Sequence, residues 1–204
     1  MTPDEPAAEA TADLGAGDAE RAGAGAATRP DVSLADDVRA VLRDVADFPE
    51  PGIVFKDFTP LLADPTLSAR VVADVTQRHL GRLDVIAGIE ARGFLFGAVM
   101  AHNLRVPFVP IRKSGKLPRE THRVDYDLEY GSASLEMHVD AVQQGQRVLV
   151  VDDVLATGGT GAATVELLRR AGARVIAIEV VLEISALDGR AALHGIPVHA
   201  LLQV

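Results

Sequence analysis

Four short runs of apolar residues, each bounded by polar or turn residues, dominate the chain from residue 85 onward. They cover residues 85–89, 106–111, 147–151 and 175–181. A strand that is buried on both faces needs apolar side chains in both directions, so runs of this kind predict a mostly parallel sheet covered by helices. We therefore predict one α/β domain.

The chain before these runs predicts two helices. Ser33 is a typical helix N-cap, and apolar residues follow it at helical spacing as far as about Asp47. Asp64 and Pro65 provide the cap and the first-turn proline of a second helix, which we expect to stop at Gly81.

Two stretches depart from this pattern. Residues 48–52 contain two prolines and a glycine, which exclude a helix and predict a rigid loop leading into the apolar run 53–55. Residues 112–138 are charged and contain turn residues, and they end in alternating apolar positions at Ala133, Leu135, Met137 and Val139. We predict a mobile excursion that returns through an antiparallel strand, because long polar insertions in compact domains are often lids.

The first thirty residues have the composition of a disordered tail. They are mainly Ala, Gly, Asp, Glu, Thr and Pro, without an aromatic residue, and cannot bury enough apolar area to offset the entropy of ordering. Their six acidic residues argue against a mitochondrial presequence. We expect residues 1–30 to form a tail and residues 31–204 to form the folded domain.

Charge and cysteine content narrow the function classes. The net charge of −9 argues against a general nucleic-acid or anionic-membrane surface, so an anion site has to be built locally. The absence of cysteine excludes disulfides and thiolate metal sites, and leaves the cytoplasm as the expected compartment. No apolar run is long enough to span a bilayer, and the six histidines show no metal-ligand spacing with acidic residues.

The most informative segment, residues 147–161, has the pattern of a buried strand, an acidic pair, a loop of small residues and a helix start. Its central part is Val151-Asp152-Asp153-Val154-Leu155-Ala156-Thr157-Gly158-Gly159-Thr160-Gly161. Glycines let a backbone approach a phosphate, loop N–H groups and threonine hydroxyls donate to it, and a helix N-terminus adds positive potential. The two carboxylates would repel a bare phosphate, so they fit sugar hydroxyls or a hydrated Mg²⁺. The segment therefore predicts a site for phosphate, ribose and metal together.

Other glycine-loop motifs fit this segment less well. A Walker loop needs Gly-Lys-Ser/Thr, and no lysine lies here. A dinucleotide fingerprint starting at Gly159 would need a third glycine where Thr164 stands. A tight turn with solvated aspartates is the structural alternative, but the doubled acid and the two Thr-Gly steps favour a functional loop.

This segment resembles the phosphoribosyl pyrophosphate (PRPP) signature of the type I phosphoribosyltransferases. Four further segments are similar to the adenine-specific members of that family: Phe48-Pro49-Glu50-Pro51-Gly52-Ile53-Val54-Phe55-Lys56-Asp57, Ala91-Arg92-Gly93-Phe94-Leu95-Phe96-Gly97, Ile111-Arg112-Lys113-Ser114-Gly115-Lys116-Leu117-Pro118 and Leu128-Glu129-Tyr130-Gly131. The resemblance covers residues 34–204. It implies an α/β fold in which a mostly parallel sheet is flanked by helices, with a flexible lid or hairpin over the site. It also implies that adenine and PRPP react to give AMP and pyrophosphate, with Mg²⁺ as cofactor, in a homodimer.

The resemblance further implies a role for each site residue. The residues expected to bind PRPP through its 5-phosphate and ribose are Asp152, Asp153, Ala156, Thr157, Gly158, Gly159 and Thr160. Pyrophosphate, with Mg²⁺ held mainly through substrate and water, is expected beside Arg92, Lys113 and Lys116. Adenine is expected at the backbone around Val54 and Lys56, between Phe55 and Ile184. The expected catalytic acid/base is Glu129, with Tyr130 beside it on the lid.

Some of these residues have a structural alternative. Arg92 could pair with Glu90, Glu129 could be a solvated lid residue, and Phe55 could be an ordinary core residue. Lys56 stands where the family most often has arginine, so a side-chain role there is open. Ile184 replaces the more usual leucine, which is a mild change in shape.

The chain has seventeen arginines but only three lysines. All three lysines fall in the predicted site segments: Lys56, Lys113 and Lys116. An ammonium group is a compact point charge for pyrophosphate that a planar guanidinium does not reproduce.

The loop 90–93 must turn its amides toward pyrophosphate, and members of this family often hold a non-proline cis peptide there. We expect that bond at Ala91–Arg92.

Two other functions remain open on the sequence. A regulatory protein could sense PRPP with the same fold, although it would need a nucleic-acid-binding module and a basic face. A transferase could instead act on hypoxanthine, xanthine or orotate. Residues 48–57 favour adenine, and incubation with PRPP, Mg²⁺ and each base would distinguish the three functions.

Overall fold

In a computed structural model of the chain, which describes residues 33–48, 50–52, 54–128 and 131–204, the larger of two sheets lies at the centre of the domain. Its strands are β3 (Val85–Ile89), β4 (Phe108–Lys113), β5 (Thr121–Leu128), β6 (Gly131–His138), β7 (Arg147–Leu155), β8 (Arg174–Glu183) and β9 (Val198–Gln203). Their order is β5-β6-β4-β3-β7-β8-β9. Five neighbouring strands of this sheet are parallel: β4, β3, β7, β8 and β9. Next to β4, the strands β6 and β5 extend the sheet with antiparallel pairing.

The predicted parallel sheet is therefore confirmed, and burial explains its sequence pattern. All five residues of β3 are buried, as are Val148 to Val151 in β7. Their side chains alternate between two hydrophobic clusters, one on each face of the sheet. Continuous apolar runs are required because both faces are covered.

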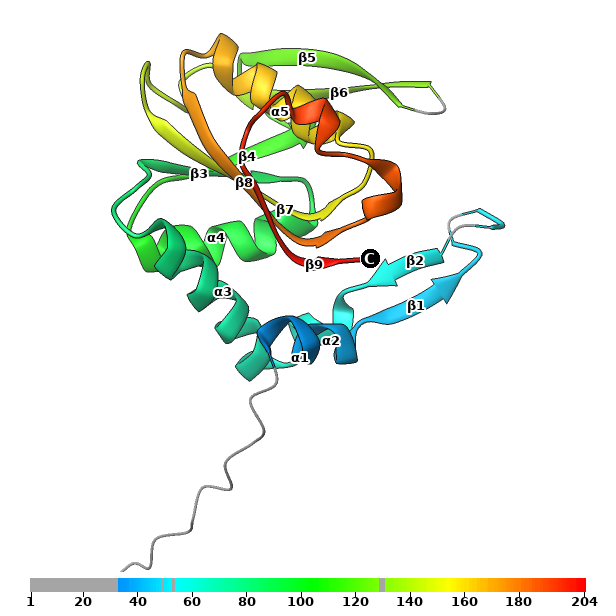
Figure 1. Cartoon of the computed structure of the whole chain (residues 1–204). Coiled ribbons are helices and arrows are strands. Elements are labelled where there is room, and N and C mark those ends of the chain that lie inside the picture. Colours follow the sequence, from blue (N-terminus) through cyan, green and yellow to red (C-terminus); the bar gives the residue numbers. More distant parts are fainter. Residues whose placement is uncertain (1–32, 49, 53, 129–130) are drawn as a thin grey trace, which may run out of the picture. The chain divides into compact units, whose positions relative to one another are not determined.

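Helices cover both faces of this sheet. They are α1 (Leu34–Val41), α2 (Thr59–Ala63), α3 (Pro65–His79), α4 (Arg92–Leu104) and α5 (Gly159–Arg170), with short 3-10 turns η1 (Ser185–Leu187) and η2 (Ala191–Leu193). Figure 1 shows α3 and α4 on one side of the sheet and α5 on the other, and the two hydrophobic clusters divide in the same way. None of the helices in the described ranges has the length and apolar character that crossing a membrane requires.

The smaller sheet is a hairpin of β1 (Arg43–Ala46) and β2 (Val54–Asp57). The first helix was predicted to run to about Asp47, which is wrong: α1 ends at Val41, and the next residues pair antiparallel with β2. Val45 lies opposite Phe55 in that ladder. A second strand supplies the backbone hydrogen bonds of β1, and this tertiary pairing overrides the helical spacing.

Other element predictions hold with shifted bounds. Asp64 caps α3 by accepting from the N–H groups of Thr66 and Leu67 at 3.0 and 2.9 Å, as the sequence predicts. The predicted antiparallel return is β6, and the preceding polar stretch contains its partner β5. Several of the described elements had no prediction of their own, among them α2, α4, β5 and β9.

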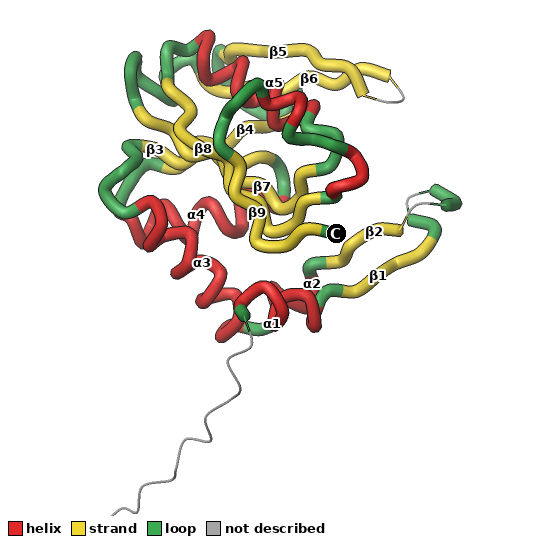
Figure 2. Tube along the Cα trace, in the orientation of Figure 1, coloured by secondary structure: helices red, strands yellow, loops and turns green. Residues whose placement is uncertain are grey.

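The β1–β2 hairpin and the β5–β6 hairpin point in the same direction in Figure 2, and residues of both line one cleft. This cleft lies at the carboxyl ends of β3 and β7, because its lining includes Ile89, Asp152 and Asp153. In parallel α/β sheets this is the edge where ligands usually bind. The fold therefore brings most of the predicted site residues that the structure describes to one place.

Candidate active site

The loop between β7 and α5 has the strand, loop and helix order that the sequence predicts. β7 ends at Leu155, and α5 begins at Gly159, directly after Gly158. Gly158 has φ +83°, and a Cβ at this position would lie 2.2 Å from the Gly189 carbonyl oxygen. Glycine is thus needed here for both conformation and space. The loop and the first turn of α5 surround a hollow of about 80 Å³, lined by residues that include Ala156, Thr157, Gly158, Gly159 and Thr160.

The first-turn N–H groups of a helix point along its axis and are not all used by the helix itself. At α5 these groups belong to the small residues Gly159, Thr160 and Gly161, whose side chains leave the approach open. The positive end of the helix faces the same hollow. This loop can therefore hold a phosphate group, and we call residues 156–160 the phosphate loop.

The acidic pair at the end of β7 lies on the wall of the main cleft. Asp153 is buried, and its Oδ2 contacts Nε of Arg92. The Asp152 carboxylate accepts a hydrogen bond of 2.9 Å from the Asp153 N–H. Burial raises the pKa of the Asp152 carboxyl well above its ordinary value, and the charge of Asp153 raises it further. Two adjacent acids in this position favour ligand hydroxyl groups, which can donate to them.

Arg92 therefore does not make the alternative pair with Glu90. The Glu90 carboxylate instead accepts from Arg112 Nε at 3.2 Å and from the Lys113 N–H at 3.0 Å. The guanidinium carbon of Arg92 lies 5.1 Å from the centre of the Phe55 ring. Arg92 thus connects the acidic pair with the aromatic end of the cleft.

The main cleft has a volume of about 740 Å³ and brings together most of the predicted site residues. Those that line it are Val54, Phe55, Lys56, Arg92, Lys113, Asp152, Asp153, Ala156, Thr160 and Ile184. The remaining phosphate-loop residues line the adjoining hollow, which shares Asp152 and Thr160 with the cleft. Lys116 is exposed and is not among the described residues that line the cleft. Its backbone N–H donates instead to Glu136 Oε1 at 2.8 Å.

Apolar side chains form one end of the cleft. Phe55 is half-buried rather than in the core, whereas its neighbour Phe58 is buried. The ring of Phe48 meets Phe55 edge-on, at 5.2 Å between ring centres. Lys56 is also on the cleft wall, but its Nζ lies 2.6 Å from Asp44 Oδ1. Ile184 is held by its backbone N–H, which donates to the Leu155 carbonyl at 2.9 Å.

Glu129 and Tyr130, the predicted acid/base and lid residues, lie outside the described residues. The hairpin that carries them contributes Tyr126 to the cleft, and sequence analysis missed this residue. The Tyr126 hydroxyl lies 3.3 Å from Thr160 Oγ1, so the β5–β6 hairpin contacts the phosphate loop. Alternation in β5, with Val124 buried and Tyr126 on the same face two residues later, was the available signal.

The predicted cis peptide is displaced by one residue. The non-proline cis bond joins Glu90 and Ala91, so its prediction at Ala91–Arg92 is wrong. Arg92 is the first residue of α4, and Ala91 already has helical backbone angles as its N-cap. The cis bond thus lies one residue earlier than predicted, between Glu90, which directly follows β3, and Ala91, which caps α4.

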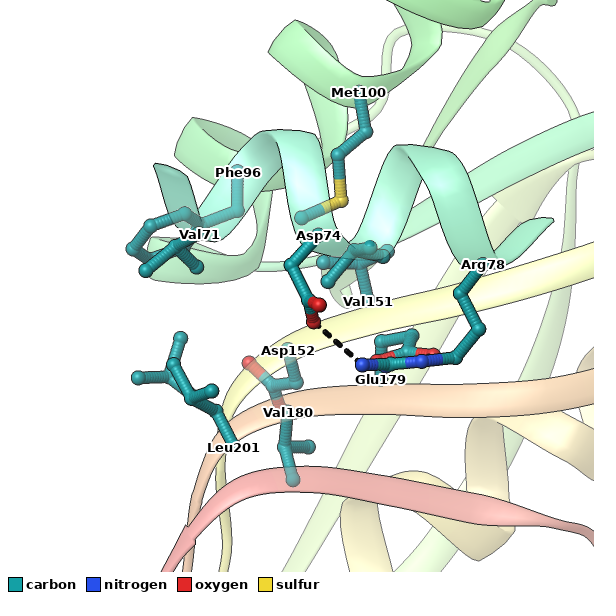
Figure 3. A pocket seen from close by; sticks show the side chains of 12 residues that line it. Val71, Asp74, Arg78, Phe96, Met100, Val151, Asp152, Glu179, Val180 and Leu201 are labelled. Carbon is teal, nitrogen blue, oxygen red and sulfur yellow. Dashed lines mark hydrogen bonds and ion pairs between the residues drawn. The ribbon is translucent and has the colours of Figure 1, made fainter. Parts of the chain in front are cut away.

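A second polar cluster lies between α3, β8 and β9. Figure 3 shows Asp74 and Arg78 of α3 beside Glu179 of β8, around a cavity of about 20 Å³. His79, Glu179 and His199 bring their side-chain ligand atoms within 4.8 Å of one another, which linear spacing did not indicate. His79 is the last residue of α3, and its side chain is buried. Arg78 already pairs with Glu179 at 2.8 Å, and the cavity has room for only about one water. The cluster therefore supplies the partners that the buried Glu179 carboxylate needs.

Comparison with known proteins agrees with this geometry. The phosphoribosyl transferase domain family matches residues 65–192. The adenine phosphoribosyltransferase of Methylococcus capsulatus is 52% identical over 168 residues, which cover 82% of this chain and 98% of that protein. The crystal structure of adenine phosphoribosyltransferase from Thermoanaerobacter pseudethanolicus is similar with a TM-score of 0.81 and 46% identity, covering 83% of this chain and 99% of that one. The Saccharomyces cerevisiae enzyme, complexed with an imino-altritol bisphosphate and adenine, has a TM-score of 0.79 at 38% identity, covering 83% and 98%.

Proposed function

The chain belongs to the phosphoribosyltransferase family, and from this membership we propose how its cleft transfers a phosphoribosyl group to adenine. The protein is an adenine phosphoribosyltransferase: adenine and PRPP give AMP and pyrophosphate, a purine salvage reaction. In this reaction adenine N9 bonds to C1′ of PRPP while the bond from C1′ to the pyrophosphate oxygen breaks. The proton of the adenine ring nitrogen has to leave.

We assign the 5-phosphate of PRPP to the phosphate loop. The supporting observation is that the positive end of α5, the small residues of its first turn and the hydroxyls of Thr157 and Thr160 surround one hollow. These donors are fixed before the ligand arrives, which reduces the cost of ordering them. The ribose then extends toward Asp152 and Asp153, whose carboxylates accept from its hydroxyl groups.

The pyrophosphate is assigned to the part of the cleft near Arg92 and Lys113, with Lys116 in the loop that follows β4. Positive side chains stabilise the negative charge that grows on pyrophosphate as its bond to C1′ breaks. The oxygen-rich acidic pair on the cleft wall suits a hard cation such as Mg²⁺, held mainly through substrate oxygens and water. Bound Mg²⁺ would neutralise part of the pyrophosphate charge.

The base is assigned to the apolar end of the cleft, between Phe55 and Ile184. The backbone around Val54 and Lys56 reads the base there, because the Lys56 ammonium is engaged with Asp44. Glu129 is proposed as the group that takes the proton from adenine, with Tyr130 beside it on the lid. In the sequence both residues lie between β5 and β6, and β5 contributes Tyr126 to the lining of the cleft.

We also propose a homodimer in the cytoplasm. The exposed apolar side chains of Leu95 and Val99, one turn apart on α4, give a surface that a second subunit could cover. The absence of cysteine gives no sign of an oxidising compartment.

One observation carries the proposed function: a single cleft joins a phosphate loop, two carboxylates and an aromatic base pocket. The test is incubation of the protein with PRPP and Mg²⁺ plus adenine, hypoxanthine, xanthine or orotate in separate reactions, followed by separation of nucleotides. We expect AMP from adenine and at least about 100-fold lower kcat/KM for the other bases, because an unpaired polar group in the base pocket is costly. Equal turnover of another base would overturn the assignment of adenine.

A further inference from the structure

The phosphate loop is supported from behind by a second loop, residues 184–190, which joins β8 to η2. The two loops touch backbone to backbone. A Cβ on Gly189 would lie 2.2 Å from the Ala156 carbonyl oxygen, and a Cβ on Gly158 would lie 2.2 Å from the Gly189 carbonyl oxygen. No side chain can enter between them, so the position of Gly189 determines the room that the phosphate loop has.

The ends of this supporting loop are joined by an ion pair. Arg190 donates through Nε to Glu183 Oε1 at 2.6 Å and through Nη2 to Oε2 at 2.7 Å. Glu183 is buried, and its Oε2 also accepts from Gln203 Nε2 at 2.9 Å. The Arg190 guanidinium further donates through Nη1 to the Val198 carbonyl at 2.9 Å. The pair therefore connects the end of β8, the supporting loop and β9.

The Glu183–Arg190 pair is bidentate, with two hydrogen bonds between one guanidinium and one carboxylate. A guanidinium that binds both oxygens of a carboxylate restricts its orientation as well as its distance. Arg190 follows Gly189 directly in the chain, and Glu183 precedes Ile184 directly. The supporting loop contacts the phosphate-loop side at two places: Gly189 packs against Ala156 and Gly158, and the Ile184 N–H donates to the Leu155 carbonyl. The ion pair holds the residue next to each of these contacts. Neither Glu183 nor Arg190 is among the described residues that line the cleft.

We propose that Glu183 and Arg190 are positioning residues, which hold Gly189 against the phosphate loop and so set the affinity of the enzyme for the 5-phosphate of PRPP. This inference rests on the proposed function, because it takes residues 156–160 as the 5-phosphate site. The pair acts through Gly189 and touches neither substrate. Its effect belongs to PRPP binding rather than to the chemical step.

The test compares Arg190→Ala with a matched ion-pair variant, Arg147→Ala. Arg147 also donates through Nε and Nη2 to one carboxylate, that of Asp84, at 3.1 and 2.7 Å. That pair lies at the start of β3 and β7, at the opposite end of the sheet from the cleft. Both variants lose a bidentate pair, so a general loss of stability appears in both. A loss of phosphate affinity appears only where the pair supports the loop.

We expect Arg190→Ala to raise KM for PRPP about tenfold at saturating adenine, with kcat changed by less than about threefold. Arg147→Ala lowers Tm without changing this KM. Arg190→Lys keeps a charge that can contact one carboxylate oxygen, so its KM falls between those of the wild type and Arg190→Ala, and it serves as the test if Arg190→Ala does not fold. An unchanged KM in a folded Arg190→Ala or Arg190→Lys variant, with an active wild type, overturns the inference. An inactive wild type instead overturns the proposed function.

Discussion

In the proposed pyrophosphate site, Arg92 and Lys113 present their positive charges in different ways. Arg92 is engaged by Asp153 and lies over the Phe55 ring, whereas Lys113 is an exposed residue on the cleft wall. A lysine places a compact charge on a flexible stem, and an arginine spreads the charge over a planar group with fixed donor directions. The two are therefore not equivalent at this position.

Lys113→Arg is expected to lower kcat/KM for PRPP about tenfold, because the guanidinium cannot follow the pyrophosphate oxygens as an ammonium can. Steady-state kinetics at saturating adenine measure this, with Lys113→Met as the comparison that removes the charge. If Lys113→Arg has the kcat/KM of the wild type while Lys113→Met does not, charge alone suffices and the argument from shape is wrong.

Lys56 leads to the opposite expectation. Its Nζ pairs with Asp44 at 2.6 Å, so the base should meet the backbone at this position. Lys56→Met is expected to change KM for adenine by less than about threefold, while Phe55→Ala, which removes a stacking face, raises it at least about tenfold. A tenfold increase in KM for Lys56→Met would instead show that the side chain takes part in reading adenine.

At the residue scale, the sequence predicts those site residues that lie close together along the chain. Asp152, Asp153 and the phosphate loop all lie within residues 152–160, so one strand and one turn place them. The partner of Arg92, the contact of Tyr126 with Thr160 and the Glu183–Arg190 pair depend on tertiary contacts. Such contacts leave no local pattern in a single chain.

At the scale of elements, the junction of β7 and α5 is the part of the fold with least freedom. Gly158 combines φ +83° with a predicted Cβ clash of 2.2 Å against Gly189. Gly145 has nearly the same φ, +82°, but a Cβ there would meet nothing within 4 Å. The two glycines therefore separate backbone strain from the steric effect on the phosphate loop.

We expect Gly158→Ala to lower kcat/KM for PRPP about 100-fold, which corresponds to ~2.7 kcal/mol of lost transition-state stabilisation. Gly145→Ala should cost some stability through its backbone angle but leave kcat/KM within about twofold. Thermal unfolding and steady-state kinetics on both variants provide the measurement. A similar kinetic loss in both variants would mean that backbone strain, not the contact with Gly189, is responsible.

Elements with strong local signals were predictable, and elements defined by a partner were not. The apolar runs of the parallel strands and the Asp64-Pro65 start of α3 were predicted because burial and capping act locally. β1 is exposed at all four residues and exists through its pairing with β2, so helical spacing misled the prediction. β5 likewise takes its register from β6.

At the scale of the whole molecule, acid stability should depend on ion pairs that join distant segments. Asp84 at the start of β3 accepts from the side chain and the backbone N–H of Arg147 in β7. The hydrogen bond from the Arg147 side chain lowers the pKa of Asp84 from its ordinary 3.8 to about 2. Because the pKa is lower in the folded state, this carboxylate stabilises the fold above pH 3.8. That contribution is lost as the pH falls from 3.8 toward 2.

Asp84→Asn is therefore expected to be less stable than the wild type at neutral pH, with a difference that narrows below about pH 4. Urea unfolding of both proteins at several pH values between neutral and mildly acidic conditions measures this difference. Because the pair is at the protein surface, added salt should reduce it as well. A difference that stays constant or widens in acid would contradict the role of this ion pair.

The proposed function depends on one assignment, which places the 5-phosphate at residues 156–160 and the base between Phe55 and Ile184. A crystal structure of the protein with AMP tests it most directly. We predict that the phosphate lies in the hollow at the start of α5 and accepts from loop N–H groups, with the ribose hydroxyls at Asp152 and Asp153 and adenine beside Phe55. A phosphate found instead at Arg92 and Lys113, with the base outside the Phe55 end of the cleft, would contradict the account.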